Sequence, residues 1–246
     1  MALAATFSAS AQQKYTVSIK NNLKSALNDV PATLDLRELK DVKSATVIVD
    51  GKEIPYQIDD LDGNGTNDEL CFLVDLEGKQ TKTATITLSN KADGKQWKAR
   101  TFAEMVLRNP KVKEKNKHDI YLSSITIDKR TTNPYNVLHH HGVAFESELI
   151  AMRIYMDKRQ TIDLYGKFHK GLELEQTQFY TSKEQKAKGY GDDVLWVGNT
   201  FGLGAFRGWN GTEPTLLEDV EHRTQRILTT GPLRTIVEVE DNQWTI

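Results

Sequence analysis

The sequence predicts an all-β, mostly antiparallel protein, with a small N-terminal β-sandwich module followed by a larger second β domain. Two observations lead to this fold class. Apolar and polar residues alternate with a period of two along most of the chain, which is the pattern of half-buried strands. Gly, Asp and Asn turn signals separate the alternating runs, so the strands are short and follow one another through tight connections.

Residues 12–95 are predicted to form the first module. The alternating runs in this part are KYTVSIKN, PATLDLREL, SATVIVDG, EIPYQIDD, ELCFLVDL and TATITLSN. The single cysteine, Cys71, lies in one of them and is expected to be a small buried side chain with no catalytic role. The polar stretch NKADGKQWKARTF then links the module to the next domain.

Residues 96–246 are predicted to form the larger domain. FAEMVLRNPKVKEKN fits either a short helix or an edge strand. Longer strands are expected in IYLSSITID, FESELIAMRIYMD, QTIDLYGKF, VLWVGN, FGLGAFRGW, RTQRILTT and LRTIVEVE. YTSKEQKAKGYGDD interrupts them with Ser/Thr caps and a Gly stop, which predicts a short helix or a mobile loop. The last strand pair lacks a covering element, so we expect the domain to be incomplete at its C-terminus.

Composition and the first residues bear on location. The net charge of -2 comes from 32 basic and 34 acidic residues spread along the chain, which does not favour nucleic acid or anionic membranes as partners. No segment approaches the ~20 apolar residues that span a bilayer. Residues 1–11 end in Ala-Ser-Ala, the small-x-small pattern of a signal-peptidase site, although the basic start is missing. We therefore expect an exported protein, periplasmic or secreted; the alternative is a disordered N-terminus of a cytoplasmic protein.

The loop DDLDGNGTNDEL places oxygen-bearing side chains at alternate positions. They are Asp60, Asp62, Asn64, Thr66 and Asp68. Calcium loops of the EF-hand type need this spacing, with a glycine at the sixth place as Gly65 is here. The twelfth place holds Cys71 instead of Glu and the flanks are strands, which excludes an EF-hand proper. Two interpretations stay open, a structural calcium site and an Asx-rich turn without an ion.

The hairpin ELIAMRIYMDKRQTIDLYGKF gathers polar side chains on one face. Arg153, Tyr155, Asp163, Tyr165 and Lys167 share this face when the apolar residues of both strands share the other. A three-residue KRQ connection places Tyr155 opposite Asp163, and a shift by two residues places Arg153 opposite Asp163. The face is either a solvent-facing polar ladder or a surface that binds a ligand.

Three consecutive histidines precede the hairpin. In an extended chain His139 and His141 point the same way and His140 points the opposite way. A zinc site would need a third ligand such as Glu146 or Glu148. Proton transfer needs only one imidazole beside a substrate, and a structural or exposed role needs neither. The sequence leaves all three interpretations open.

The runs HHHGVAFESELIAMRIYMDKRQTIDLYGK and GYGDDVLWVGNTFGLGAFRGW resemble a bacterial family, domain of unknown function 4861, common in Bacteroidetes near polysaccharide-degrading enzymes. The resemblance covers most of residues 14–246. It implies an exported β-sandwich protein acting on complex glycans, with a larger domain related to the galactose-mutarotase and lyase-type supersandwiches. Some relatives are associated with water elimination from unsaturated uronic-acid oligosaccharides, as in ulvan breakdown.

Elimination beside a uronate needs a cation for the carboxylate, a base for the carbon-bound proton and an acid for the leaving oxygen. We expect Arg153 to bind the carboxylate, with Asp163 orienting it or a tyrosine. The candidate bases are His140 and His141, and the candidate acids are Tyr155, Tyr165 and Tyr190. The candidate substrate-binding residues are His139, Glu146, Lys167, Asp192, Arg207 and Trp209. No cofactor is expected for the catalysis.

Two other functions fit the same residues. A glycoside hydrolase would use two carboxylates from the set Glu146, Glu148, Asp192 and Asp193. Asp192 and Asp193 are a poor pair, because adjacent residues of an extended chain point to opposite faces. A non-catalytic glycan-binding protein would use its aromatic side chains to stack on sugar rings.

Overall fold

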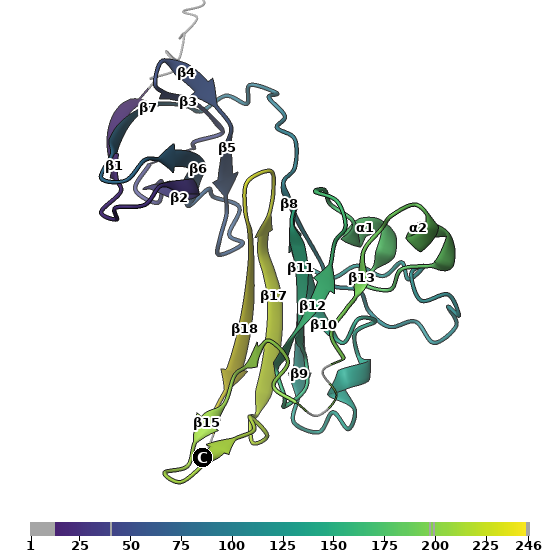
Figure 1. Ribbon diagram of the computed structural model, residues 1–246. Helices are drawn as coiled ribbons and strands as arrows, with labels where there is room; N and C mark the ends of the chain where they lie inside the picture. Colours follow the sequence, from purple (N-terminus) through teal and green to yellow (C-terminus); the bar gives the residue numbers. More distant parts are fainter. Residues whose placement is uncertain (1–12, 40, 197, 199, 245–246) are drawn as a thin grey trace, which may run out of the picture. The chain divides into compact units, whose positions relative to one another are not determined.

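The computed structural model describes residues 13–39, 41–196, 198 and 200–244. Within these residues the fold is all-β: the named strands pair antiparallel, and the two α-helices are four and five residues long (Figure 1). This confirms the predicted all-β, mostly antiparallel class. None of the helices in the described ranges is long and apolar enough to cross a bilayer. The chain divides into two compact units, the first ending at Lys98 and the second beginning at Ala99, where the sequence placed a boundary after residue 95.

The first unit consists of two antiparallel sheets. One has the strand order β1 (Gln13–Lys20), β7 (Thr81–Ser89), β3 (Ser44–Val49) and β4 (Lys52–Ile54). The other has the order β2 (Leu27–Asp35), β6 (Glu69–Leu76) and β5 (Tyr56–Asp59). Alternate residues of both sheets, such as Val47, Ile86 and Phe72, are buried in one hydrophobic core. The six alternating runs of the sequence are these seven strands, and Cys71 is buried on β6.

The second unit contains a six-stranded and a three-stranded sheet. The first has the order β13 (Asp192–Asp193), β12 (Thr161–Gly166), β11 (Ile150–Tyr155), β10 (Gly142–Ser147) and β8 (Thr101–Glu104), and β14 (Gly204–Ala205) also pairs with β12. The second has the order β18 (Thr235–Asn242), β17 (His222–Thr230) and β9 (Ser124–Asp128). The remaining elements are the strand pair β15 (Gly208–Trp209) and β16 (Pro214–Thr215), the helices α1 (Leu174–Thr177) and α2 (Lys183–Ala187), and the 3-10 helix η1 (Pro134–Asn136).

The six-stranded sheet has one apolar and one polar face. Val143 and Ile154 on the apolar face lie in one core cluster with Ile227 and Val237 of the three-stranded sheet. Because side chains alternate along a strand, their burial turns Arg153 and its cross-strand neighbours to the opposite face. That face is covered by the segment around α1, whose Leu174 and Phe179 pack against Ala144, Ala151 and Tyr165. The candidate site lies within this covered polar layer.

Two segments differ in how well the sequence predicted them. The expected helix in YTSKEQKAKGYGDD is α2, which begins after Ser182 with the capping box that Ser182 and Gln185 form. By contrast, VLWVGN and FGLGAFRGW were predicted as strands, and the described part of residues 194–209 contains only β14 and β15. Most large apolar side chains there, including Trp196, are exposed, so little burial stabilises an extended strand.

Candidate functional site

Arg153 and Asp163 face each other across β11 and β12, which is the second of the two registers that the sequence allowed. The connection between the strands is five residues long and is closed by the N–H of Gln160, which donates to the carbonyl of Asp157 at 3.0 Å. Nε and Nη2 of Arg153 both donate to Oδ2 of Asp163, at 2.9 and 2.5 Å. Arg153 is only 3% exposed and Asp163 is fully buried, so the interpretation as a solvent-facing ladder is wrong.

The other N–H groups of Arg153 also have partners, and together they form what we call the Arg153 network. Nη2 donates to Oδ2 of Asp193 at 3.0 Å and to the hydroxyl of Tyr155 at 3.3 Å. Nη1 donates to the hydroxyl of Tyr180 at 3.0 Å and contacts the carbonyl of His140 at 3.5 Å. This pairing is what permits a buried guanidinium, since an unpaired one would cost several kcal/mol. It leaves no N–H for the carboxylate of a ligand, so the structure does not support the role expected for Arg153.

His141 is half-buried, and one of its ring nitrogens has no hydrogen-bond partner among the described residues. Its Nδ1 lies 2.8 Å from the carbonyl oxygen of Tyr135, and because a carbonyl only accepts, Nδ1 carries the hydrogen. Nε2 then holds a free lone pair. The His141 ring stacks on that of Tyr135 with centroids 3.7 Å apart. The backbone of His141 itself has a positive φ of 69°. Burial, with the charge of Arg153 contributing, lowers the pKa of His141 to about 4. His141 is therefore a neutral imidazole near neutral pH, able to accept a proton.

Tyr180 is a residue of the site that the sequence analysis missed. Its hydroxyl accepts the hydrogen bond from Arg153 and has its own hydrogen free to donate. Its ring centroid lies 6.4 Å from that of His141. Burial raises the pKa of Tyr180, and the nearby Arg153 guanidinium opposes that rise. It follows α1 in a segment without strand alternation, and no sequence signal marked it.

Tyr155 differs from Tyr180 in its partners. Its hydroxyl donates to Oδ2 of Asp163 at 3.0 Å, so its hydrogen is already bound within the protein. Burial, with the charge of Asp163 contributing and Arg153 opposing, raises the pKa of Tyr155 well above its usual range. Of the two phenols in the Arg153 network, Tyr180 is the better proton donor to a ligand.

The other two histidines of the triplet are buried. His140 has Nδ1 2.7 Å from the carbonyl oxygen of Gly142, and its Nε2 lies 3.5 Å from Oε1 of Glu104. Among the described residues neither carboxyl oxygen of Glu104 has a hydrogen-bond partner, and burial raises the pKa of this group. His139 stacks on His118 with centroids 3.9 Å apart, and burial lowers its pKa to about 2. His141 is therefore the candidate base of the three.

Three of the predicted residues have structural partners in the buried layer. Tyr165 lies further along the same face, where its hydroxyl donates to Oε2 of Glu173 at 2.8 Å. Glu146 and Lys167 form a buried ion pair, and Glu146 also accepts the N–H groups of Glu173 and Leu174 where α1 begins. These contacts hold α1 on the sheet, and they are not available to a substrate.

The remaining predicted residues lie outside the Arg153 network. Asp192 forms an ion pair with Lys186. Arg207 donates to two main-chain carbonyls, and Trp209 is 58% exposed on β15. Tyr190 lines a polar groove beside α2. In the described part of the chain no hydrogen bond, ion pair or ring contact joins these four side chains to the network, so the structure gathers only part of the predicted set.

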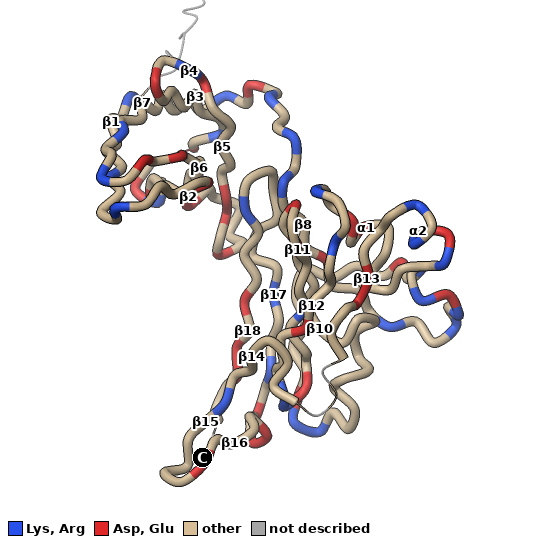
Figure 2. The backbone as a smooth tube through the Cα atoms, in the orientation of Figure 1, with Lys and Arg blue, Asp and Glu red and all other residues tan. Residues whose placement is uncertain are grey.

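Two exposed cations accompany His141 and Tyr180. They belong to the loop between β8 and β9, in which Lys and Arg recur (Figure 2). Nζ of Lys115 lies 4.8 Å from the ring centroid of Tyr180. The charge of Arg108 contributes to the lowered pKa values of both His118 and His141, after burial, which is the main cause. Neither cation forms a salt bridge with any described residue, so both are free to meet an anion.

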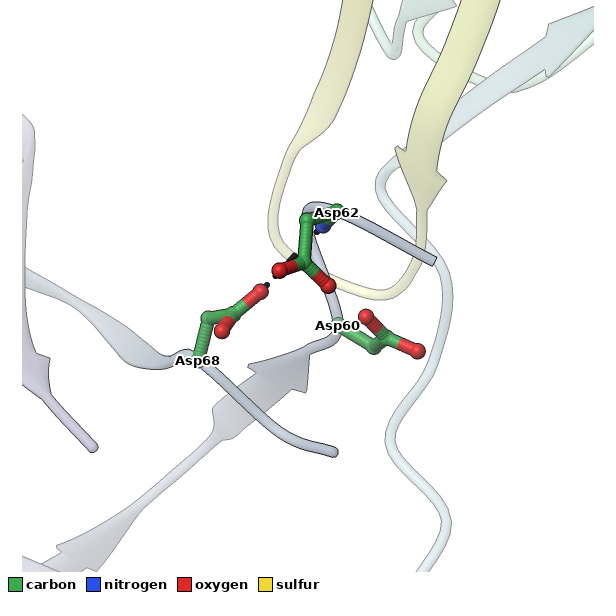
Figure 3. Close-up of side chains that lie close together, drawn as sticks. All are labelled: Asp60, Asp62 and Asp68. Atoms are coloured by element: carbon green, nitrogen blue, oxygen red, sulfur yellow. Dashed lines mark hydrogen bonds between the residues drawn. The ribbon is translucent and has the colours of Figure 1, made fainter. Parts of the chain in front are cut away.

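The first unit carries the acidic loop. Asp60, Asp62 and Asp68 each offer an oxygen, and these oxygens lie within 4.8 Å of one another (Figure 3). Among the described residues this is the one cluster of three or more His, Cys, Asp or Glu side chains close enough to hold a metal ion. The triple histidine belongs to no such cluster, so the described structure gives the zinc interpretation no support.

Main-chain N–H groups already donate hydrogen bonds to some of the side-chain oxygens of this loop. Asp60 accepts from Gly63 and Gly65, at 2.8 and 2.7 Å, and these bonds lower its pKa. Asn64 accepts from Thr66 at 2.7 Å, an internal Asx turn. Each carboxylate oxygen has a second lone pair, so the same geometry serves an ion-free turn or a cation.

Comparison with curated proteins finds no match for this chain, and neither does comparison with solved structures. The relation of the larger domain to galactose-mutarotase-like supersandwiches accordingly stays a prediction. A family model described as domain of unknown function (DUF4861) matches residues 19–246, nearly the whole sequence. The quoted runs around the histidines and the hairpin lie inside that match. The chain belongs to the DUF4861 family.

Proposed function

We propose that this protein is an exported carbohydrate-active lyase that eliminates water or an alkoxide from uronic-acid-containing oligosaccharides. The observation that supports this most is the state of His141: its Nδ1–H is bound to the Tyr135 carbonyl, so Nε2 is a free base. A phenol whose hydrogen has no acceptor among the described residues, Tyr180, has its ring centroid 6.4 Å from that of His141. A base and an acid of this kind are what an elimination needs.

In the proposed elimination His141 acts once as the base and Tyr180 acts once as the acid. Nε2 of His141 takes the proton from the carbon beside the carboxylate, and that electron pair forms the new carbon–carbon double bond. The bond from the neighbouring carbon to its oxygen breaks, and the departing oxygen receives the hydroxyl proton of Tyr180. The Tyr180 phenolate is stabilised by Arg153, whose Nη1 lies 3.0 Å away. Transfer of the proton from the His141 imidazolium to the phenolate, through solvent, restores the starting state.

The substrate carboxylate is assigned to the exposed cations rather than to Arg153. Arg108 and Lys115 form no salt bridge with described residues, and Lys115 lies above the Tyr180 ring. A cation beside the carboxylate stabilises the negative charge that develops there when the carbon loses its proton. In this proposal Arg153 acts through Tyr180 and does not touch the substrate.

Hydrolysis has weaker support because its candidate carboxylates are paired. Glu146 lies against Lys167, Glu148 against Arg100, Asp192 against Lys186 and Asp193 against Arg153. A hydrolase needs two carboxyl groups facing one glycosidic bond, and each of these four faces a cation of the protein itself.

The reaction class is tested by incubating the protein with saturated uronate oligosaccharides, in which the carbon beside the carboxylate carries a proton, while recording the absorbance of the new double bond. A change in absorbance with loss of one water in the product mass supports elimination. Released monosaccharide supports hydrolysis instead, and binding without any product supports a glycan-binding protein.

Two further parts of the proposal concern location and metal. Export is supported by the small-x-small ending of residues 1–11, which lie outside the described residues. Structural calcium in the first unit is supported by the three carboxylates of Asp60, Asp62 and Asp68 lying within 4.8 Å of one another. The catalytic proposal uses neither this ion nor any other cofactor.

A further inference from the structure

We infer that a polar groove beside the His141–Tyr180 site binds the third sugar unit, a negatively charged one, of the oligosaccharide whose first unit reacts there. The inference rests on the proposed function in taking both units from one substrate. The groove lies between the loop leading to β9 and the α1–α2 segment, which run side by side in Figure 1. Its walls include Asn116, Lys117, Tyr121, Gln178, Lys188 and Tyr190.

Aromatic rings connect the groove to the site. His118 lines the groove and stacks on His139 at 3.9 Å. His139 in turn packs edge-on against Tyr180, with centroids 5.3 Å apart. When the leaving group is an alkoxide, the sugar unit on the departing oxygen lies on the side of Tyr180, the proposed acid. A sugar unit beyond the reacting one can therefore reach the groove without crossing the sheet.

The walls of the groove are held in place by buried hydrogen bonds. Gln178 is 3% exposed; its Oε1 accepts the N–H of His118 at 3.1 Å, and its Nε2 donates to the His118 carbonyl at 2.7 Å. The same Nε2 donates to the hydroxyl of Tyr121 at 3.1 Å. Asn116 donates to Gln185 at 2.9 Å, and Gln185 also caps α2. A preformed groove loses little entropy when it binds a ligand.

The groups that remain free suit an anionic sugar. Tyr121 is 55% exposed, so it presents a ring face, while its hydroxyl is fixed by Gln178. Tyr190 has no hydrogen-bond partner for its hydroxyl among the described residues, and Lys117 and Lys188 form no salt bridge there. Hydroxyl groups and a ring face are what a sugar needs, and two unpaired ammonium groups favour a carboxylate on it. Glu175 is the acid among the lining residues, so cations outnumber it.

The test is binding as a function of oligosaccharide length. The probes are saturated di-, tri- and tetrasaccharides from partial acid hydrolysis of ulvan, pectate and alginate, titrated calorimetrically into the His141→Ala variant of the full chain. We expect at least one series to bind, with the trisaccharide about tenfold tighter than the disaccharide. The Lys117→Ala/Lys188→Ala double variant and Tyr121→Ala should each abolish that gain and leave disaccharide binding unchanged.

Lys113→Ala is the matched control, because Lys113 is an exposed lysine of the same loop that does not line the groove. The inference is overturned if no series binds, if length brings no gain, or if the double variant keeps the gain. It is also overturned if Lys113→Ala loses the gain as fully as the double variant does. The two proposals fail separately: length-dependent binding without elimination contradicts the proposed function alone, and elimination without a length dependence contradicts the groove alone.

Discussion

Arg153 and Asp163 lie directly opposite each other on β11 and β12, and the guanidinium donates to a single oxygen, Oδ2, through both Nε and Nη2. Both side chains are almost completely buried. We predict that Asp163→Asn lowers the free energy of unfolding of the second unit by about 3–5 kcal/mol, because it leaves a buried charge without its main counter-ion. Urea denaturation measures this change.

The control for this prediction is an ion pair of the same unit that lies at the surface. Lys158 and Glu218 pair with about half of each side chain exposed. Glu218→Gln should therefore change the free energy of unfolding by less than about 1 kcal/mol. Equal effects of Asp163→Asn and Glu218→Gln would show that the Arg153 network contributes nothing beyond a surface pair.

Acid should destabilise the second unit through its histidines. The pKa of His141 is lowered from 6.5 to about 4, mainly by burial, and that of His139 to about 2. Between about pH 6.5 and pH 4 these imidazoles bind protons in the unfolded chain but not in the folded chain. The free energy of unfolding therefore falls as the pH drops through this range. His141→Asn removes one such group and should flatten the slope of unfolding free energy against pH. An unchanged slope in that variant would place His141 in a far more solvated setting.

Glu104 gives the opposite pH dependence. Burial raises its pKa, and an acid with a raised pKa stabilises the fold fully below its unfolded pKa and loses that contribution as the pH rises through the folded value. We predict that Glu104→Gln, which has no carboxyl proton to lose, becomes more stable relative to the native protein as the pH rises from about 5 to 8. Unfolding free energies at the two pH values measure this, and a constant difference would contradict it.

Calcium should stabilise the first unit if the acidic loop binds it. At a calcium concentration one hundred times the Kd, the gain is about 2.7 kcal/mol, seen as a higher Tm than in chelator. Asp60→Asn combined with Asp62→Asn should abolish the gain, and Asp41→Asn, an exposed acid of the same unit outside the loop, should preserve it. A Tm that calcium does not move would identify the loop as an ion-free Asx turn.

The strands were predictable because local alternation is sufficient to mark them. Every alternating run between Lys14 and Asn90 is a strand, and the even register of β11 with β12 follows from matching their apolar faces. The choice between the two even registers was not predictable. It depends on the connection after Tyr155, where Gln160 adopts a positive φ of 41° that no sequence rule required.

The covering of the polar face was the part that sequence could not provide. Leu174 and Phe179 reach Ala144 and Tyr165 through contacts between residues distant in sequence. This cover turned the predicted polar ladder into a buried network and made Tyr180 part of it. Alternation also cannot say which histidine of a run is buried. In the structure two of them are buried: His140 lies beside Glu104 of β8, and His139 stacks on His118.

The central claim is that His141 and Tyr180 are the base and acid of an elimination. The most direct measurement is kcat on saturated uronate oligosaccharides, with loss of water followed by mass spectrometry, for His141→Ala, Tyr180→Phe and the exposed-histidine control His222→Ala. The account predicts that the first two lose about a hundredfold or more in kcat and that His222→Ala keeps the native rate. A folded His141→Ala or Tyr180→Phe protein that turns over within about twofold of the native rate would contradict it.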